Sequence, residues 1–400
     1  MGRAVAVFTA VCVVACLVVG RADDTPPAAP TAGFAEYLKS AYGDTEPPEG
    51  ARMLMAILEG SQMGPGEGWF GPAESRYGYD WLADRLGVAD PAAGIARERF
   101  PATDEAFAVL DRNGDGTIQP SDLDWSDGNP FVRVSYALNR IFRRLDARAA
   151  GGLTKDEWTA IFDEAAGTDG ELSAKEFAAR LLRGEAGGFT PGDKPTTESL
   201  VRGLLAGEIG SIYAGPGVGD RAPVFRLREA RGEGTIAIDS LLGEKPLVLV
   251  FGNFTCGPFR SFYPAVDALH ATYGDRAGFL MVYVREAHPE DGWKMESNAR
   301  AGVAVPQPRS FAERVEVAGQ FCTKLEPTMP VVVDDVNDSV GHAYSGMPAR
   351  LYLVDRDGRV AYKSGRGPFG FIPGELEQAL VMHLLEADGQ SAAADVPAVP

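Results

Sequence analysis

Cysteine and histidine are scarce in this chain of 400 residues, which contains 4 of each. Cys12 and Cys16 fall in an apolar N-terminal run, so Cys256 and Cys322 are left for the body of the chain. Two cysteines cannot build the disulfide framework of a small secreted domain. They leave two interpretations open: one structural bridge, or an attacking thiol with its resolving partner.

Basic residues are also few relative to acidic ones. The chain has 38 Lys and Arg against 56 Asp and Glu, which gives a net charge of −18. A nucleic-acid partner is not expected, because phosphates need a basic face. The charge suits a soluble protein that binds cations, and the length allows two or three domains with proper cores.

The N-terminal residues 1–22 have the pattern of a signal peptide. A short basic start is followed by an almost continuous apolar run up to Gly20, and small residues follow at the cleavage position. We expect an exported protein, periplasmic or extracellular. A lipoprotein signal around Cys16 and an uncleaved membrane anchor remain alternatives, although the apolar run is short for spanning a bilayer.

Composition divides the rest of the chain into segments. We predict a leader and helical segment, an all-α domain, a linker rich in Gly, Pro and Thr, an α/β domain and a disordered tail, at residues 23–100, 101–185, 186–220, 221–388 and 389–400 respectively.

An acidic loop at residues 111–122 resembles the EF-hand family. Oxygen-bearing side chains stand at loop positions 1, 3 and 5, a glycine at position 6 allows the sharp turn, and an apolar Ile118 follows at position 8. A turn without metal is the alternative. The predicted ligands of one Ca²⁺ ion are Asp111, Asn113, Asp115, Thr117, Gln119 and Asp122. Asp122 replaces the usual glutamate at position 12, which predicts weaker or more magnesium-like binding.

Two later loops are degenerate copies of this pattern. The loop at residues 146–157 carries Arg148 and Ala150 at ligand positions, so it should not bind calcium. We expect it to pair with the first loop, with Leu153 opposite Ile118. A third copy at residues 165–176 lacks the first ligand.

The stretch at residues 245–259 carries the strongest chemical signal. An apolar run predicts a buried strand, which breaks at Gly252 and leads through Cys256 into a helix with Pro258 in its first turn. A helix N-terminus lowers the pKa of a thiol and favours the nucleophilic thiolate. A small buried cysteine is the alternative. Phe259 stands three residues after Cys256, where a dithiol would need its second cysteine, so dithiol exchange at this turn is excluded.

Further elements alternate in the order βαβαββα, which predicts a thioredoxin-like domain with a mixed central sheet. The predicted strands lie at residues 277–285, 329–334, 349–354 and 360–363, and the helices at 310–324 and 373–387. In this pattern a cis bond between Met329 and Pro330 would lie beside Cys256.

Several motifs in this domain resemble the iodothyronine deiodinase family, in order and with compatible spacing over residues 245–385. They are FGNFTCGPF, VYVREAHPEDGW, MPVVVDDV, ARLYLVDRDGRVAYK and GPFGFIP. The resemblance places Cys256 at the family's selenocysteine position. It implies catalytic roles for Thr255, Glu286 and His288, and substrate contacts from Phe259, Trp293, Pro330 and Arg350. Apart from the resemblance, an oxidised sulfur at Cys256 needs a second thiol to reduce it, and either Cys322 as a resolving thiol or a separate reductant would serve.

The resemblance has two departures. Sulfur replaces selenium at Cys256, and residues 305–309 lack the family's further histidine, so thyroid hormone is not the expected substrate. We expect a thiol-dependent redox enzyme that attacks a small electrophile, a halogenated aromatic or a peroxide, and is restored by an external thiol reductant. A thiol peroxidase and a non-catalytic calcium-binding module are the alternatives. A homodimer is an expectation from the family alone.

Overall fold

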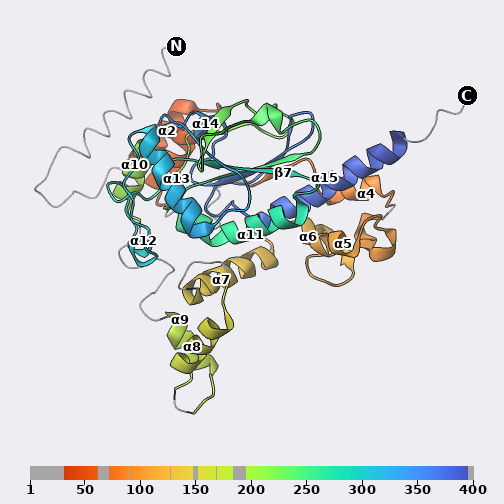
Figure 1. Cartoon of the computed structure of the whole chain (residues 1–400), viewed down its shortest axis with the longest axis horizontal. Coiled ribbons are helices and arrows are strands. Elements are labelled where there is room, and N and C mark those ends of the chain that lie inside the picture. Colours follow the sequence, from red (N-terminus) through yellow and green to blue (C-terminus); the bar gives the residue numbers. More distant parts are fainter. Residues whose placement is uncertain are drawn as a thin grey trace, which may run out of the picture.

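A mixed sheet forms the centre of the protein (Figure 1). The computed structural model describes residues 31–61, 72–88, 90–126, 128–146, 152–167, 169–182 and 195–394. In these ranges the strands of the sheet run in the order β1-β10-β9-β6-β7-β8-β4-β5. Their bounds are β1 Glu74–Ser75, β4 Arg226–Glu229, β5 Thr235–Ala237, β6 Leu247–Gly252, β7 Gly278–Tyr283, β8 Val331–Val333, β9 Arg350–Val354 and β10 Val360–Lys363.

Strand β6 lies in the middle of the sheet and is buried on both faces. All of its residues are buried, as the uninterrupted apolar run predicts. It pairs in parallel with β7, with Val250 opposite Met281, and antiparallel with β9, with Val250 opposite Leu351. This mixed pairing confirms the thioredoxin-like sheet predicted for the C-terminal half.

Helices cover the two faces unequally. One face packs against α11 (Gly257–Tyr273), α13 (Phe311–Leu325) and α15 (Pro373–Ala394), and the other against α14 (Ser339–Ala343) (Figure 1). The short helix α12 (Glu296–Arg300) lies in the loop after β7. Helix α15 runs beyond residue 388, where the disordered tail was expected to begin. In the described ranges, no helix is both long and apolar enough to cross a membrane. The predicted signal peptide lies outside those ranges.

The predicted position of the cis-proline is wrong. The structure has cis bonds at Met347–Pro348 and Gly367–Pro368, and not at Met329–Pro330. The reason is the position of β8 in the sheet, two strands away from β6. Strand β8 pairs in parallel with β7, whereas the strand next to β6 is β9, so the proline that precedes β9 is the one beside the end of β6.

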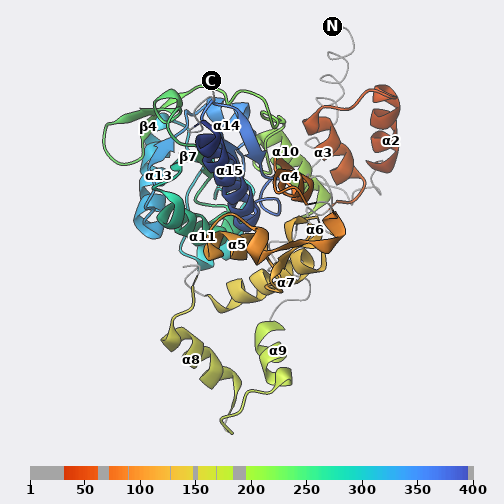
Figure 2. The same ribbon diagram turned by 90° about the vertical axis from the view of Figure 1, so that its right-hand side faces the viewer.

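Residues 186–220, expected to be a linker, contain a packed helix. Helix α10 (Thr197–Ala206) buries Leu200, Val201 and Leu204 against α3 (Glu49–Leu58), which also packs on α2 (Thr31–Tyr42). Figure 2 shows these three helices together on one side of the molecule. The apolar face of α10 is therefore part of a core.

The EF-hand-like segment is not a separate all-α domain, because its first part packs on the C-terminal domain. Its elements are α5 Asp104–Leu110, β3 Thr117–Ile118, α6 Pro120–Leu123, α7 Pro130–Leu145, α8 Lys155–Ala165 and α9 Ala174–Leu182, and they are preceded by α4 (Tyr79–Arg85) and β2 (Ile95–Ala96). Gln378 of α15 donates to the carbonyls of Val109 and Asp122 at 3.0 and 3.1 Å. Helices α8 and α9 project away from the sheet (Figure 2).

The predicted pairing of Leu153 with Ile118 is wrong. Strand β3 pairs with β2, and Ile118 lies opposite Ile95. A strand that precedes α5 thus takes the place expected for the second loop. The strand that pairs with the first loop therefore comes from residues that precede this loop in the chain, and not from the second loop.

A pH-dependent stability should follow from Glu375 at the start of α15. Burial raises the pKa of this carboxyl from its ordinary 4.5 to about 7, although Tyr362 donates a hydrogen bond to it and Arg112 attracts its charge. Because the folded pKa lies above the unfolded one, the contribution of Glu375 to stability is present below about pH 4.5 and is lost as the pH rises through about 7.

We therefore expect Glu375→Gln to be more stable relative to the parent at pH 8 than at pH 4. Urea unfolding at the two pH values measures the difference. The same difference in unfolding free energy at both values would contradict the assignment.

Candidate functional site

Cys256 lies where the buried strand β6 gives way to α11. It occupies the N-cap position of this 17-residue helix, with Pro258 in the first turn, and its side chain is buried. Gly252 ends the strand, and a Cβ at this position would overlap the ring of Phe259. The turn thus holds the sulfur at the positive end of a long helix, which favours negative charge there.

Asn253, which the sequence analysis did not identify, fixes the shape of the turn. Its side chain is fully buried, and its Oδ1 accepts hydrogen bonds from the backbone N–H of Cys256 at 2.9 Å and of Ala287 at 3.3 Å. Its Nδ2 donates to the carbonyl of Pro348 at 3.0 Å. One amide therefore joins three chain segments. A polar residue directly after an entirely apolar strand is the signal that could have revealed it.

Glu286 lies beneath the turn as a fully buried carboxyl group. Thr255 donates to its Oε2 from the backbone N at 2.9 Å and from Oγ1 at 2.8 Å, and the hydroxyl of Tyr283 donates to Oε1. Burial raises the pKa of Glu286, and the hydrogen bonds from Tyr283 and Thr255 oppose this rise. A carboxyl group with a raised pKa is suited to hold and pass on a proton.

His288 is joined to the same threonine. Its backbone N–H donates to Thr255 Oγ1 at 3.0 Å, and its ring Nδ1 lies 3.1 Å from the carbonyl oxygen of Trp293. A carbonyl only accepts, so Nδ1 carries the hydrogen and Nε2 is the nitrogen that gains or loses a proton. The Trp293 ring meets the imidazole edge-on, with centroids 4.6 Å apart. The structure thus brings together Thr255, Glu286, His288 and Trp293.

Arg260 is a second buried group that the sequence analysis missed. Its guanidinium donates to the carbonyl of Phe254, and through Nη2 to Asn298 Oδ1 at 2.9 Å. Asn298 in turn donates to the carbonyl of Thr255 at 2.8 Å. Burial lowers the pKa of Arg260, and the negative charge of Cys256 acts in the opposite direction. The same attraction stabilises a thiolate at Cys256.

Three residues expected to contact substrate lie elsewhere. Phe259 is buried in the core, and its ring packs on those of Tyr263 and Phe321. Pro330 is exposed at the start of β8, two strands away from β6. Arg350 on β9 is buried and lies opposite Phe251, which faces the core on the other side of the sheet from Cys256.

Cys322 lies on α13 in the same core cluster as Cys256, and no disulfide joins the two. Its side chain is buried, and burial raises the pKa of its thiol. A raised pKa disfavours the thiolate that a resolving step needs. The role of Cys322 as a resolving thiol stays a prediction.

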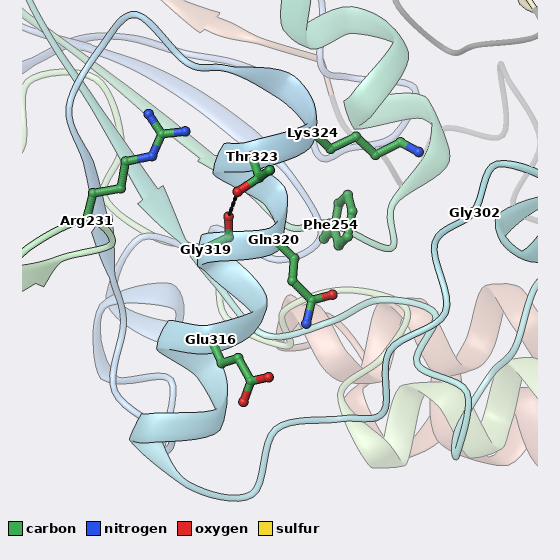
Figure 3. A pocket seen from close by; sticks show the side chains of 8 residues that line it. All are labelled: Arg231, Phe254, Gly302, Glu316, Gly319, Gln320, Thr323 and Lys324. Carbon is green, nitrogen blue, oxygen red and sulfur yellow. Dashed lines mark hydrogen bonds between the residues drawn. The ribbon is translucent and has the colours of Figure 1, made fainter.

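An open hollow of about 610 Å³ borders the turn after β6 at Phe254. Figure 3 shows that the Phe254 ring and the side chains of Gln320 and Lys324 surround the same space, along the outer face of α13. Two cations and one carboxylate line it, which leaves an excess of positive charge. The lining residues are Arg231, Phe254, Gly302, Glu316, Gly319, Gln320, Thr323 and Lys324.

In the predicted calcium loop, the carboxylates of Asp111 and Asp122 accept hydrogen bonds from backbone N–H groups of the loop itself. Asp111 Oδ2 accepts from the N–H of Gly116 at 2.8 Å, and the carboxylate of Asp122 accepts from the N–H groups of Gln119 and Asn113 at 2.8 and 3.2 Å. In the part of the chain that the structure describes, no three Asp, Glu, His or Cys side chains converge as a metal site. The oxygen donors suit a hard cation in chemistry, but they would have to turn toward it.

These features define a redox protein of thioredoxin-like fold that relies on a single cysteine at the helix turn. The model of the iodothyronine deiodinase family matches residues 196–383. Thyroxine 5-deiodinase from Aquarana catesbeiana is 34% identical over 198 residues, which are 49% of this chain and 71% of that protein. The enzyme of the same name from Gallus gallus is 32% identical over 182 residues, 45% of this chain and 68% of that protein. The chain belongs to the iodothyronine deiodinase family.

Another relative and a solved structure match a smaller share of this chain. A thyroxine 5-deiodinase from Sparus aurata is 38% identical over 143 residues, 36% of this chain and about half (52%) of that protein. Among solved structures, a peroxidoxin from Mycobacterium tuberculosis matches with 15% identity and a TM-score of 0.30, over 42% of this chain and 97% of its own. The fold assignment rests on the strand order and not on this structural likeness.

We expect Asn253→Ala to destabilise the protein by about 3 kcal/mol, because it leaves buried N–H and C=O groups without partners. Chemical denaturation measures the loss. Asn337→Ala, at an exposed position, is the matched control and should change stability by less than about 0.5 kcal/mol. Equal losses in the two variants would show that the Asn253 hydrogen bonds do not hold the turn together.

Proposed function

We propose that the chain is a thiol-dependent oxidoreductase that removes halogen reductively from small aromatic molecules, with Cys256 as the nucleophile. The observation that carries this proposal is the convergence at Thr255. This residue precedes Cys256, its hydroxyl donates to the carboxylate of Glu286, and it accepts from the backbone N–H of His288. The turn that carries the nucleophile is therefore hydrogen-bonded to a buried carboxylate and to the backbone of a histidine, and both of these residues can handle protons.

In the first step the Cys256 thiolate attacks the iodine of an aryl iodide. A sulfur–iodine bond forms, the carbon–iodine bond breaks, and its electron pair stays on the ring carbon. That carbon takes a proton from the imidazole of His288, whose backbone N–H is bound by Thr255. The products are the dehalogenated ring and a sulfenyl iodide on Cys256, so the ring is reduced and the sulfur is oxidised.

Two equivalents of an external thiol complete the cycle. The first attacks the oxidised sulfur, forms a mixed disulfide and expels iodide. The second attacks the mixed disulfide, releases the Cys256 thiol and leaves as the oxidised reductant. The positively lined hollow beside Phe254 (Figure 3) is the side from which we expect a small anionic thiol to approach.

A thiol peroxidase is the second candidate, and Arg260 is the observation that favours it. A fixed positive charge near the sulfur stabilises a thiolate, which can also attack a peroxide oxygen. Sulfenic acid forms on Cys256 and an alcohol leaves, and two thiols then restore the cysteine with release of water.

The two candidates can be separated by turnover with a dithiol reductant, using iodophenols and hydroperoxides as alternative substrates. Cys256→Ser should lose at least about 1,000-fold in turnover of both, because it removes the nucleophile. His288→Gln should lower dehalogenation by about 100-fold, the usual contribution of a general acid. A larger effect of His288→Gln on the peroxide reaction would favour the peroxidase.

Cys322→Ser is the matched control, since its sulfur is buried in the same core. It should keep its turnover when an external thiol is present. Unchanged turnover in Cys256→Ser would overturn Cys256 as the nucleophile, and no turnover by the parent would leave the non-catalytic calcium-binding module.

We also propose that the loop at residues 111–122 binds one Ca²⁺ ion with modest affinity. Support comes from its oxygen donors and from its turn at Gly116, whose φ of 87° suits the sharp bend of such loops. Binding would have to replace the backbone N–H partners of Asp111 and Asp122 with the cation, which predicts weak affinity.

Calorimetry and Trp125 fluorescence test the calcium proposal, because the Arg112 guanidinium of the loop lies 4.5 Å from the Trp125 ring. Asp122→Glu should tighten Ca²⁺ binding by about tenfold, since the longer carboxylate reaches the ion with both oxygens. Asp111→Ala should abolish it, and Glu157→Gln in the second loop should not change it. Binding that survives Asp111→Ala would place the ion elsewhere.

A further inference from the structure

A second, more enclosed cavity of about 190 Å³ lies on the side of the molecule where α10 ends. Its wall combines the end of α10 and the segment that follows it with the end of β7, with α14, and with the residue before the cis-proline. Val284 and Arg285 of the motif VYVREAHPEDGW line this cavity, but the sequence analysis predicted no site from either residue. The residues that shape the inference are Leu205, Ile212, Tyr213, Arg285, His342 and Met347.

The mouth of this cavity is apolar and open to solvent. Leu205, Ile212 and Tyr213 are 49%, 46% and 49% exposed, although large apolar side chains are normally buried. All three line the same small hollow. Exposed apolar side chains gathered around a concave site indicate a ligand with an apolar body.

The charged side chains of the wall are Arg285 and Asp338, and the arginine is only loosely paired. Arg285 Nη1 lies 3.4 Å from Asp338 Oδ2, whereas Arg314 contacts the other oxygen of Asp338 at 2.7 Å. Two guanidinium groups thus share one carboxylate, and Arg314, the closer, is its better partner. Arg285 Nε is buried and has no hydrogen-bond partner in the described part of the chain. Arg285 therefore has donor capacity left with which it can bind an anion at the cavity wall.

The volume limits the size of the ligand. A cavity of about 150 Å³ holds one benzene molecule, so about 190 Å³ accommodates one aromatic ring with a small substituent and not two rings. The ring of Tyr213 lies 5.0 Å from that of His342 at the mouth, which adds aromatic surface. We infer that this cavity binds a single-ring aromatic carboxylate, with its ring against the apolar mouth and its carboxylate on Arg285.

The cavity is joined to the catalytic turn by short contacts. Met347 forms part of its wall, and Met347 Sδ lies 3.9 Å from Nδ2 of Asn253. The backbone carbonyl of Met347 also accepts a hydrogen bond from the N–H of Ser211 at 3.1 Å. Met347 therefore contacts both Asn253 and the segment that forms the mouth of the cavity. Binding at this site goes beyond the proposed function, because it does not use the sulfur of Cys256.

Binding of 4-iodobenzoate tests the inference, measured by calorimetry and saturation-transfer NMR on the full chain and on its Cys256→Ser variant. Both should bind equally. Arg285→Gln should weaken binding at least tenfold, whereas Arg309→Gln, an exposed arginine in the neighbouring loop, should leave it unchanged. Equal affinities of the Arg285→Gln variant and the parent would overturn the inference.

A second variant keeps the test decisive if Arg285→Gln fails to fold. Ala206 lies at the exposed end of α10 and lines the cavity, so Ala206→Trp should block it without disturbing the core. Retained binding in Ala206→Trp would overturn the inference, as would equally tight binding of 4'-iodobiphenyl-4-carboxylate. Binding without any turnover would refute only the proposed function, and turnover without binding here would refute only this inference.

Discussion

The buried carboxyl group of Glu286 is the constraint on which the candidate site depends. It accepts hydrogen bonds from Thr255 and Tyr283, so it joins the turn after β6 to the loop after β7. These two strands are parallel neighbours, and the carboxyl ends of parallel strands meet at one edge of the sheet. A carboxyl group between them therefore fixes where His288 lies relative to Cys256. Without it, the helix turn would still present a thiol, but the proton donor would not be fixed in place.

Burying so many polar groups at one turn is favourable only because nearly all of them are paired. Asn253, Glu286 and Arg260 are almost fully buried, and each one binds backbone groups of the turn itself. An unpaired buried polar group costs about 1 to 3 kcal/mol, so the network specifies one conformation of the turn. Pairing also has an electrostatic effect. The guanidinium of Arg260 and the positive end of α11 act on the same sulfur and favour its charged form.

The sequence predicted the local elements better than their long-range partners. Uninterrupted apolar runs located β6, β7 and β8, and the helix turn at Cys256 followed from Gly252 and Pro258. The proline beside the cysteine was misplaced because β8 adds a parallel strand that local patterning cannot order in the sheet. Asn253, Arg260 and Tyr283 were missed for a related reason. Their roles depend on partners that lie close only after folding, such as Pro348 for Asn253 and Asn298 for Arg260.

Segments before residue 196 complete the domain that the family model matches. Glu49 of α3 contacts Arg366 at 2.7 Å, and both side chains are largely buried. Burial lowers the pKa of Arg366 to about 10, and the neighbouring charge of Arg350 acts in the same direction. The negative charge of the Glu49 carboxylate raises the pKa of Arg366 and so opposes both effects. Removing one partner of a buried ion pair costs about 3 to 5 kcal/mol, since the other charge stays buried and unpaired. The N-terminal helices are therefore part of the electrostatic balance of the C-terminal sheet, and a chain cut at residue 196 would leave Arg366 without it.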